Sequence, residues 1–141
     1  MLDDAGIEAV LRSARRIAVI GASSNPARPS FGVFRTLVRA GFDVVPVNPN
    51  ESTIDGVAVH PTLESAVAAT GPVDIVDVFR RSELCPPHAR EAVAVGASCL
   101  WLQLGIASWE AASIAAAAGL SVVMDRCTAI ELHRIGPATA S

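Results

Sequence analysis

The stretch that decides the fold is Arg16-Ile17-Ala18-Val19-Ile20-Gly21-Ala22-Ser23-Ser24-Asn25-Pro26-Ala27-Arg28-Pro29-Ser30-Phe31-Gly32. Residues 17–20 form a short apolar run that is typical of a buried strand. Gly21 predicts a tight turn after this strand, and an amphipathic helix is expected to begin near Pro29. A strand, a turn of small residues and a helix N-terminus together favour anions, because free N–H groups and the helix dipole attract negative charge. The stretch therefore predicts a site for a phosphate-bearing cofactor.

The chain has 141 residues, which is enough for one domain with a sizeable hydrophobic core. Hydrophobic residues make up 51% and charged residues 18%, which indicates a globular rather than a disordered protein. The formal net charge of −3 argues against general nucleic-acid binding. No apolar run has membrane-spanning length, and the N-terminus lacks a signal-peptide pattern. We therefore expect a cytoplasmic protein without membrane contact.

The basic residues and the cysteines exclude some kinds of chemistry. All 11 basic residues are arginines, and the lack of lysine excludes Schiff-base chemistry and a P-loop lysine. The planar arginine fork is well suited to phosphate oxygens. Cys85, Cys99 and Cys127 lack the spacing of a metal site, and in a cytoplasmic protein they are expected to be reduced. No metal site is predicted, since the histidines have no partner at ligand spacing either.

Apolar segments alternate with helical patterns along the chain. Strands are expected at residues 17–20, 42–47, 73–79, 99–103 and 120–124. Helices are expected at about residues 4–14, 29–40, 62–69, 82–95, 108–118 and 129–135. Continuously apolar strands are typical of a parallel sheet covered on both faces, so the fold class is α/β, a doubly wound, Rossmann-like domain with a five-stranded, mainly parallel sheet. We expect a single domain over residues 1–141, with a core at about 15–135 and a loose tail from Gly136 onward.

Several local expectations accompany this assignment. Helical spacing places Val38 on the inward face of its helix. Pro46 suggests an interruption in the hydrogen-bond ladder of its strand. Ser82 is expected to cap the helix that follows it. Trp101 and Trp109 are expected to serve packing.

Ligands of such sheets bind beyond the carboxyl ends of the strands, at the point where the strand order reverses. The segments that follow the expected strands are residues 21–30, 48–50, 79–82, 103–106 and 125–127. Candidate binding residues should therefore lie in these segments.

The turn after the first strand departs from the dinucleotide-binding fingerprint. It reads Gly21-Ala22-Ser23-Ser24-Asn25-Pro26, so the second and third glycines of the fingerprint are missing. The second strand ends at Val47-Asn48-Pro49, without the carboxylate that holds the ribose of NAD. The turn offers hydroxyls, an amide and Arg28 instead, and Arg80 and Arg81 follow the third strand. Such a crevice favours a nucleotide with more phosphate than NAD, and coenzyme A fits that description.

These residues carry a family resemblance. The matching segments are residues 20–30, 45–49, 74–81, 101–106 and 124–127. They resemble the small stand-alone CoA-binding proteins, a Rossmann-like family similar to the N-terminal domain of the succinyl-CoA synthetase α subunit. The resemblance implies CoA or acyl-CoA as the ligand. The residues expected to bind it are Gly21, Ala22, Ser23, Ser24, Asn25, Arg28, Ser30, Val47, Asn48, Pro49, Phe79, Arg80 and Gln103.

The resemblance also divides these residues into roles. It implies that Ser23 and its neighbours contact the phosphates and that residues 47–49 line the adenosine side. Phe79, Arg80 and Gln103 would close the pocket. The phosphorylated histidine of the synthetase belongs to a second domain that this chain lacks, so ligase chemistry is not implied.

Other interpretations of the same residues stay open. The polar turn at 23–25 could simply cap a helix, and the arginines could be solvated surface charges. Asn48 could only start a turn, and Gln103 could serve backbone hydrogen bonding. Cys127 follows an arginine that could favour its thiolate, but a structural or redox-reactive thiol is the simpler interpretation.

Two function classes compete with a CoA-binding module without catalytic residues. One is an enzyme that uses acyl-CoA or NAD(P) in the same crevice. The other is an interaction subunit that keeps the fold without a ligand. The alanine-rich segment 111–118 allows close helix contact, which would serve internal packing or a homo-oligomer equally well, so association with a further copy or a partner enzyme is left open.

Overall fold

The computed structural model describes residues 1–136, and the tail expected beyond Gly136 lies outside the described residues. Its elements are α1 (Asp4–Ser13), β1 (Arg16–Ile20), α2 (Pro29–Arg39), β2 (Asp43–Val47), β3 (Thr53–Ile54), β4 (Val57–Ala58), α3 (Leu63–Thr70), β5 (Ile75–Val78), η1 (Ser82–Leu84), α4 (Cys85–Ala94), β6 (Cys99–Leu102), α5 (Trp109–Ala117), β7 (Ser121–Val123) and α6 (Thr128–Ile135). No helix within residues 1–136 is both long and apolar enough to cross a membrane.

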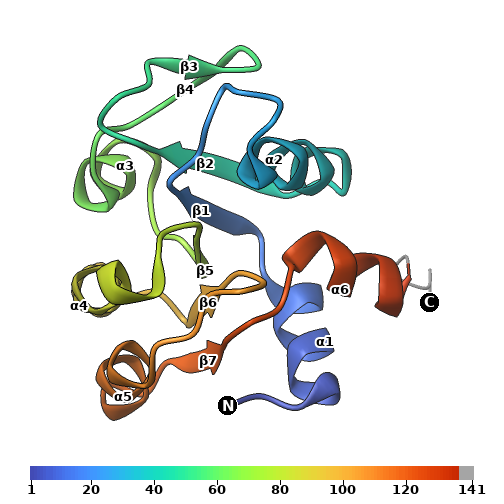
Figure 1. Cartoon of the computed structure of the whole chain (residues 1–141), viewed down its shortest axis with the longest axis vertical. Helices are drawn as coiled ribbons and strands as arrows, with labels where there is room; N and C mark the ends of the chain where they lie inside the picture. Colours follow the sequence, from blue (N-terminus) through green and yellow to red (C-terminus); the bar gives the residue numbers. More distant parts are fainter. Residues whose placement is uncertain (137–141) are drawn as a thin grey trace.

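The central sheet has five strands in the order β2-β1-β5-β6-β7, and every neighbouring pair is parallel. Helices α3, α4 and α5 cover one face, and α1, α2 and α6 cover the other (Figure 1). The predicted doubly wound α/β fold is therefore confirmed. Its strands are apolar throughout because both of their faces are buried.

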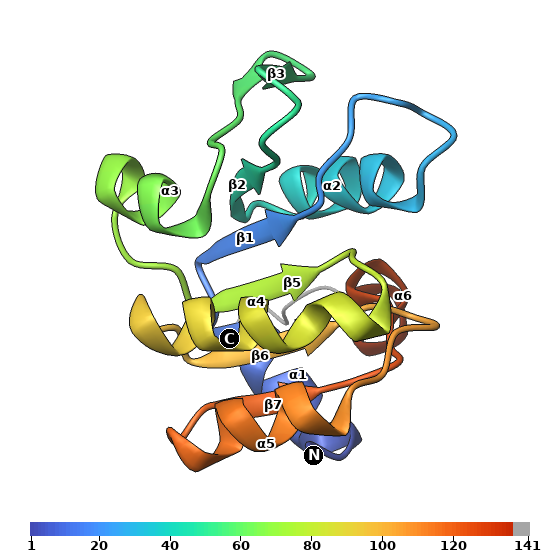
Figure 2. The ribbon, with the colours of Figure 1, turned by 60° about the vertical axis from the view of Figure 1, so that its left-hand side comes forward.

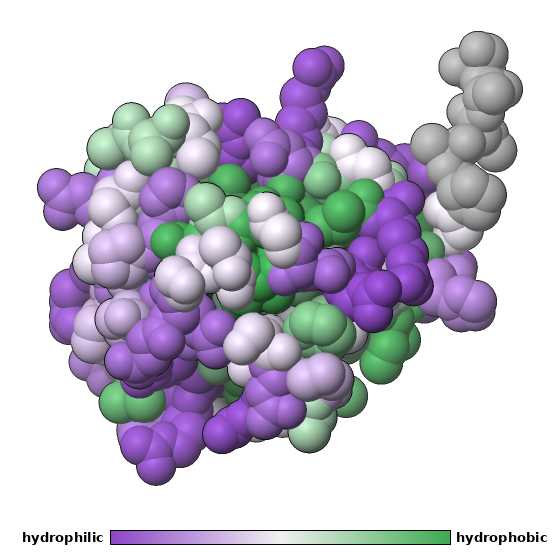
Figure 3. Space-filling model, turned by 90° about the horizontal axis from the view of Figure 1, so that it is seen from above, coloured by the Kyte–Doolittle hydropathy of each residue, from purple (hydrophilic) through white to green (hydrophobic). Residues whose placement is uncertain are grey.

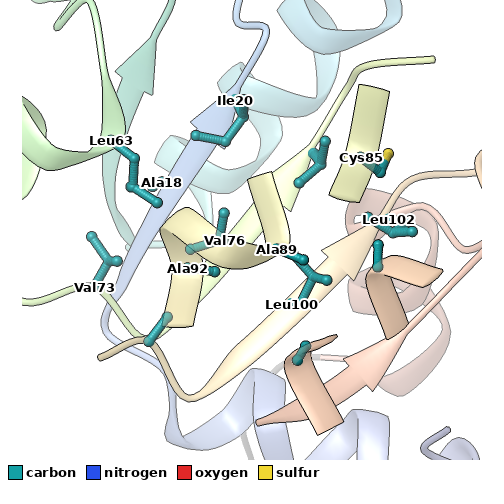
Figure 4. Close-up of a cluster of buried hydrophobic side chains, with 14 of the residues drawn as sticks. Ala18, Ile20, Leu63, Val73, Val76, Cys85, Ala89, Ala92, Leu100 and Leu102 are labelled. Atoms are coloured by element: carbon teal, nitrogen blue, oxygen red, sulfur yellow. The ribbon is translucent and has the colours of Figure 1, made fainter. Parts of the chain in front are cut away.

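Successive residues of each strand contribute to two separate cores. In β1, Ala18 and Ile20 face α3 and α4, whereas Ile17 and Val19 face the helices of the other side. Figure 4 shows the first of these clusters, in which alanines of α4 lie directly over β5 and β6. Small side chains allow this helix to approach the sheet closely. Each buried valine, leucine or isoleucine side chain contributes about 1.5–3 kcal/mol to such a core.

Two expected packing positions are wrong. Val38 is 44% exposed, because the buried stripe of α2 runs through Val33, Phe34 and Leu37 and leaves Val38 at its margin. Trp109 is 72% exposed, because it is the first residue of α5 and precedes the residues that face the sheet. Trp101 is fully buried as expected.

Ser82 does not cap a long helix. It begins the short 3₁₀ helix η1, and α4 begins only at Cys85. The Ser82 hydroxyl instead accepts a hydrogen bond from the Ala107 N–H, at 3.1 Å. This hydrogen bond joins the loop after β5 to the loop after β6, so the serine stabilises the carboxyl edge of the sheet.

The expected interruption at Pro46 is absent. Pro46 pairs with Val19 in an unbroken register between β1 and β2. Its carbonyl accepts a hydrogen bond from the His60 N–H, so the missing N–H of the proline lies on the outer side of an edge strand.

Seen from this edge, apolar side chains gather in the middle of the face and hydrophilic ones border them (Figure 3).

Candidate ligand-binding site

The strand order reverses between β1 and β5, since the chain continues from β1 to β2 on one side and from β5 to β6 on the other. Figure 2 shows the strand arrows pointing to one side, where the loops that follow β1, β5 and β6 gather. A crevice at this reversal is where such folds bind ligands.

Gly21 lets the two central loops approach each other. The Phe79 N–H donates to the Ile20 carbonyl at 2.8 Å, which brings the loop after β5 against the turn after β1. A Cβ atom on Gly21 would lie 2.6 Å from the Phe79 carbonyl oxygen, and its φ of +82° is one that side chains disfavour. Only glycine fits this turn without a backbone shift.

A polar pocket of about 400 Å³ opens at the crevice, and we call it the arginine pocket. Its lining residues are Gly21, Ser23, Arg28, Ser30, Asn48, Phe79, Arg80, Arg81 and Leu84. Within residues 1–136, neither Arg28 nor Arg80 takes part in an ion pair. Arg81 pairs with Glu83 at 3.3 Å, but both side chains are exposed, so the pair adds little stability. The pocket therefore carries cationic groups that are available to an anion.

Helix α2 begins beside this pocket in an unusual way. Arg28 occupies its N-cap position and makes no side-chain capping hydrogen bond, and Pro29 follows at the first helical position. A cation at the positive end of a helix dipole is unfavourable, and the first N–H groups of a helix lack partners within it. An anion bound at this helix start would offset both costs.

A second pocket, of about 590 Å³, adjoins the first, and we call it the apolar pocket. Its lining residues are Pro29, Val33, Phe79, Arg80, Arg81, Ser82, Gln103, Leu104, Gly105, Ile106, Cys127 and Ile130. Phe79, Arg80 and Arg81 line both pockets, so one ligand could occupy both. Volumes of this size are usual for small-molecule sites.

A buried hydrogen-bonded cluster lies at the wall of the apolar pocket. The Gln103 Nε2 donates to Asp77 Oδ1 at 2.6 Å and to Thr128 Oγ1 at 3.0 Å, and the Thr128 hydroxyl donates to Asp77 Oδ2 at 3.0 Å. Asp77 is fully buried, and burial raises the pKa of its carboxyl to about 7 although the hydrogen bonds from Gln103 and Thr128 oppose the rise. This cluster fixes the end of β6 to the start of α6.

The structure brings most of the predicted binding residues together. Those that line the arginine pocket are Gly21, Ser23, Arg28, Ser30, Asn48, Phe79 and Arg80, and Gln103 lines the adjoining apolar pocket. Their contact with a ligand stays a prediction. Asn48 also has a structural role, since its Nδ2 donates to the Ala22 carbonyl at 2.7 Å and its Oδ1 accepts from the Asn50 N–H at 2.8 Å.

The other predicted residues do not line either pocket: Ala22, Ser24, Asn25, Val47 and Pro49. Ala22 and Val47 are buried, and the Val47 carbonyl accepts from the Gly21 N–H at 3.0 Å. The Ser24 hydroxyl donates to Glu51 at 3.1 Å, and Asn25 Oδ1 accepts from the Ala27 N–H at 3.0 Å. Ser24 and Asn25 therefore shape the turn, as the alternative interpretation of a polar capping turn allowed.

The binding residues predicted from the sequence do not include several residues that line the pockets. Arg81, Ser82, Cys127 and residues 104–106 follow strand ends, so their place in the sequence carries a signal. No sequence signal could have identified the other four, because only the packing of η1, α2 and α6 turns them toward the pockets: Pro29, Val33, Leu84 and Ile130.

The cysteines differ in their surroundings. Burial raises the pKa of Cys85 to about 11 and that of Cys99 to about 12, so both stay protonated thiols at neutral pH. Cys127 is partly exposed and lines the apolar pocket. Among residues 1–136, no group of three histidine, cysteine or acidic side chains is placed to hold a metal ion.

A doubly wound sheet with an anion-favouring crevice at the strand reversal is typical of nucleotide-binding α/β proteins. A family model described as a CoA binding domain matches residues 15–133, and the chain belongs to this family, which confirms the resemblance. The uncharacterized protein YneT of Bacillus subtilis (strain 168) is 39% identical over 123 residues, which are 87% of this chain and 89% of that protein.

Solved structures share the fold closely. A hypothetical protein from Pyrococcus horikoshii OT3 matches with a TM-score of 0.89 and 32% identity, over 96% of this chain and 94% of that one. The protein called cell-free ID.343 from Thermus thermophilus matches with a TM-score of 0.87 and 36% identity, over 96% of this chain and all 100% of that one. The Rossmann-like architecture is thus common to this chain and to small proteins of nearly equal length.

Proposed function

We propose that this protein binds coenzyme A or an acyl-CoA at the carboxyl edge of its sheet, as a binding module without a catalytic step. The observation that carries the proposal is the convergence of Arg28 and Arg80, which come from two different strand ends and have no acidic partner within residues 1–136. Unpaired arginines beside a helix start suit the phosphates of a nucleotide.

The two pockets correspond to the two halves of this ligand. Coenzyme A joins a phosphate-rich nucleotide, with a pyrophosphate and a 3′-phosphate, to a less polar pantetheine arm. We assign the phosphates to the arginine pocket, where hydroxyls of Ser23 and Ser30 complement the guanidinium groups. The pantetheine arm then enters the apolar pocket past Phe79. A nucleotide without such an arm would leave the apolar pocket empty.

Calorimetric titration tests this proposal. We expect CoA and acetyl-CoA to bind at micromolar concentrations and NADH to bind at least tenfold more weakly, because the β2 end lacks a ribose-binding carboxylate. Binding of CoA should weaken as salt increases, since it depends on charge. If NADH binds and neither CoA nor acetyl-CoA does, the proposal is wrong.

One observation favours an enzyme as the second candidate, namely that Cys127 lines the apolar pocket where a thioester would lie. A transferase that forms an acyl-cysteine would release free CoA thiol from acetyl-CoA. Mass spectrometry of the protein after incubation with acetyl-CoA would reveal the acetyl group on Cys127, and Cys127→Ser should abolish it. We expect the protein mass to stay unchanged, in agreement with a binding module.

A further inference from the structure

We propose that the side-chain carbonyl oxygen of Gln103 accepts a hydrogen bond from an amide N–H of the pantetheine arm. The inference rests on the proposed CoA site and adds a residue that distinguishes the arm from other apolar groups. It makes Gln103 a binding residue, and it makes Asp77 and Thr128 positioning residues that act through Gln103.

The buried cluster determines which way the Gln103 carboxamide faces. Both N–H groups of Nε2 are engaged, one by the Asp77 carboxylate at 2.6 Å and one by the Thr128 hydroxyl at 3.0 Å. Asp77 Oδ1 accepts from Gln103 and Oδ2 accepts from Thr128, so the ionised carboxylate, which predominates above pH 7, holds the amide nitrogen toward Asp77 and the oxygen away from it. The hydroxyl of Thr128 is in turn committed to the other carboxylate oxygen, at 3.0 Å.

The Gln103 carbonyl oxygen is left without a partner. The residue is only 3% exposed, and no hydrogen bond among residues 1–136 uses its Oε1. Gln103 lines the apolar pocket, so this oxygen is available from that pocket. This oxygen is not among the side-chain atoms that are fully buried without a partner, so it can be reached from the pocket, where a ligand N–H would take the place of water as its donor.

The rest of the pocket wall leaves few rivals for this role. Arg80 and Arg81 have side chains with donors only, and the Ser82 hydroxyl already accepts from the Ala107 N–H. The remaining wall is largely apolar, with side chains such as Phe79 and Ile106. A ligand group that suits an apolar wall with one free acceptor oxygen is itself apolar along its length and carries an N–H. The pantetheine arm, with two secondary amides between short alkyl segments, is such a group.

The hydrogen bond from the pantetheine arm to Gln103 can be tested by comparing the dissociation constants of two ligands. One is CoA, and the other is 3′-phosphoadenosine 5′-diphosphate, which keeps the phosphates and lacks the arm. In Gln103→Met we expect the dissociation constant for CoA to rise about tenfold and that for the nucleotide fragment to change less than twofold. Arg80→Ala is the matched control, and it should weaken both ligands by similar factors, because it removes a phosphate contact.

A second variant tests the positioning residues. In Asp77→Asn, residue 77 gains an N–H₂ group, which lets the Gln103 carboxamide turn over and direct its oxygen inward. CoA affinity should then fall relative to the fragment, as in Gln103→Met, although Gln103 itself is intact. An unchanged ratio of the two affinities in Gln103→Met, or equal weakening of both ligands, would overturn the inference.

One measurement needs no variant and so survives any folding defect. Two CoA analogues, each with one pantetheine amide replaced by an ester, lack one N–H apiece. Wild-type protein should bind one of them about tenfold more weakly than CoA. Equal binding of both analogues and CoA would refute the contact and leave the proposed function standing, whereas failure of wild-type protein to bind CoA or the fragment would refute the proposed function and the inference with it.

Discussion

The two ends of the central sheet differ in how their charged side chains are paired. At the amino end, Arg16 pairs with Asp43 at 2.6 Å, and Asp74 accepts hydrogen bonds from the N–H groups of Arg15 and Arg16 at 2.9 and 3.0 Å. These groups are paired within the protein, whereas the Arg15 side chain has no acidic partner among residues 1–136. A hollow of about 1020 Å³ lies at this end, between α1, α2 and α6, and it is larger than either pocket at the carboxyl end.

At the carboxyl end two arginines of the arginine pocket are unpaired. Arg28 and Arg80 line the arginine pocket without an acidic partner among residues 1–136, and Asp77 is buried with neutral partners. Neither the size of a hollow nor an unpaired arginine distinguishes the two ends, since Arg15 lines the larger hollow at the amino end. The start of α2 and the direction of the strands favour the carboxyl end, where we propose the ligand site.

The largest effect is expected at the buried carboxyl of Asp77. Burial raises its pKa from the ordinary value of 3.8 to about 7 in the folded protein. The folded state then holds the proton that the unfolded state loses, so this group's contribution to stability is full below pH 3.8 and is lost as pH rises to 7. The loss is on the order of 4 kcal/mol.

Asp77→Asn should remove that part of the pH dependence. Denaturant unfolding at several pH values between 4 and 8 would show a variant that is less stable than wild type at pH 4 and gains on it steadily up to pH 7. Two curves that stay parallel across this range would show that Asp77 does not titrate there.

The next effect concerns two glycines with positive φ, one at each end. Gly21→Ala should lower the free energy of unfolding by about 3 kcal/mol, because its Cβ would overlap the Phe79 carbonyl. Gly41→Ala at the amino end is the matched control, with a φ of +96° and nothing within 4 Å of the added Cβ. It should cost only about 1 kcal/mol. Thermal and denaturant unfolding of both variants measure this difference. Equal losses of unfolding free energy would mean that the positive φ, and not the contact with Phe79, determines the cost.

Ligand affinity should respond only to arginines of the carboxyl end. Arg28→Ala or Arg80→Ala should raise the dissociation constant for CoA about 10- to 100-fold, since each removes a charge-assisted phosphate contact. Arg15→Ala, in the wall of the amino-end hollow, should leave it within twofold. Calorimetry on the three variants measures this contrast, and a large effect of Arg15→Ala would place the ligand at the wrong end.

The smallest effect is expected at the thiols. N-ethylmaleimide should modify Cys127 alone in the folded protein, since Cys85 and Cys99 are buried with raised pKa values. Acetyl-CoA, which has no free thiol, should slow this reaction severalfold by filling the apolar pocket. The rate can be followed by mass spectrometry, with Cys127→Ser as the unreactive control. Unchanged labelling in saturating acetyl-CoA would place the ligand outside this pocket.

The order of the elements, and the edge of the sheet at which we propose the ligand site, follow from residue patterns along the chain. Short continuous apolar runs bounded by turn residues predict strands that are buried on both faces, and the loops after parallel strands lie at one edge. The turn at Gly21 and the arginines after strand ends were therefore predictable as neighbours in space. The family resemblance followed from the same segments, and it is confirmed over residues 15–133.

Which side chains line a pocket and which support its wall depends on contacts between elements that are distant in the sequence. The Ser23 hydroxyl accepts from the Asn25 N–H at 3.1 Å within the turn and Ser23 also lines the arginine pocket, whereas Ser24 and Asn25 line neither pocket. The direction of the Gln103 carboxamide depends on Asp77 and Thr128, which lie 26 and 25 residues away. Local patterns report spacing along one element, whereas these roles depend on contacts between elements that meet only when the sheet assembles.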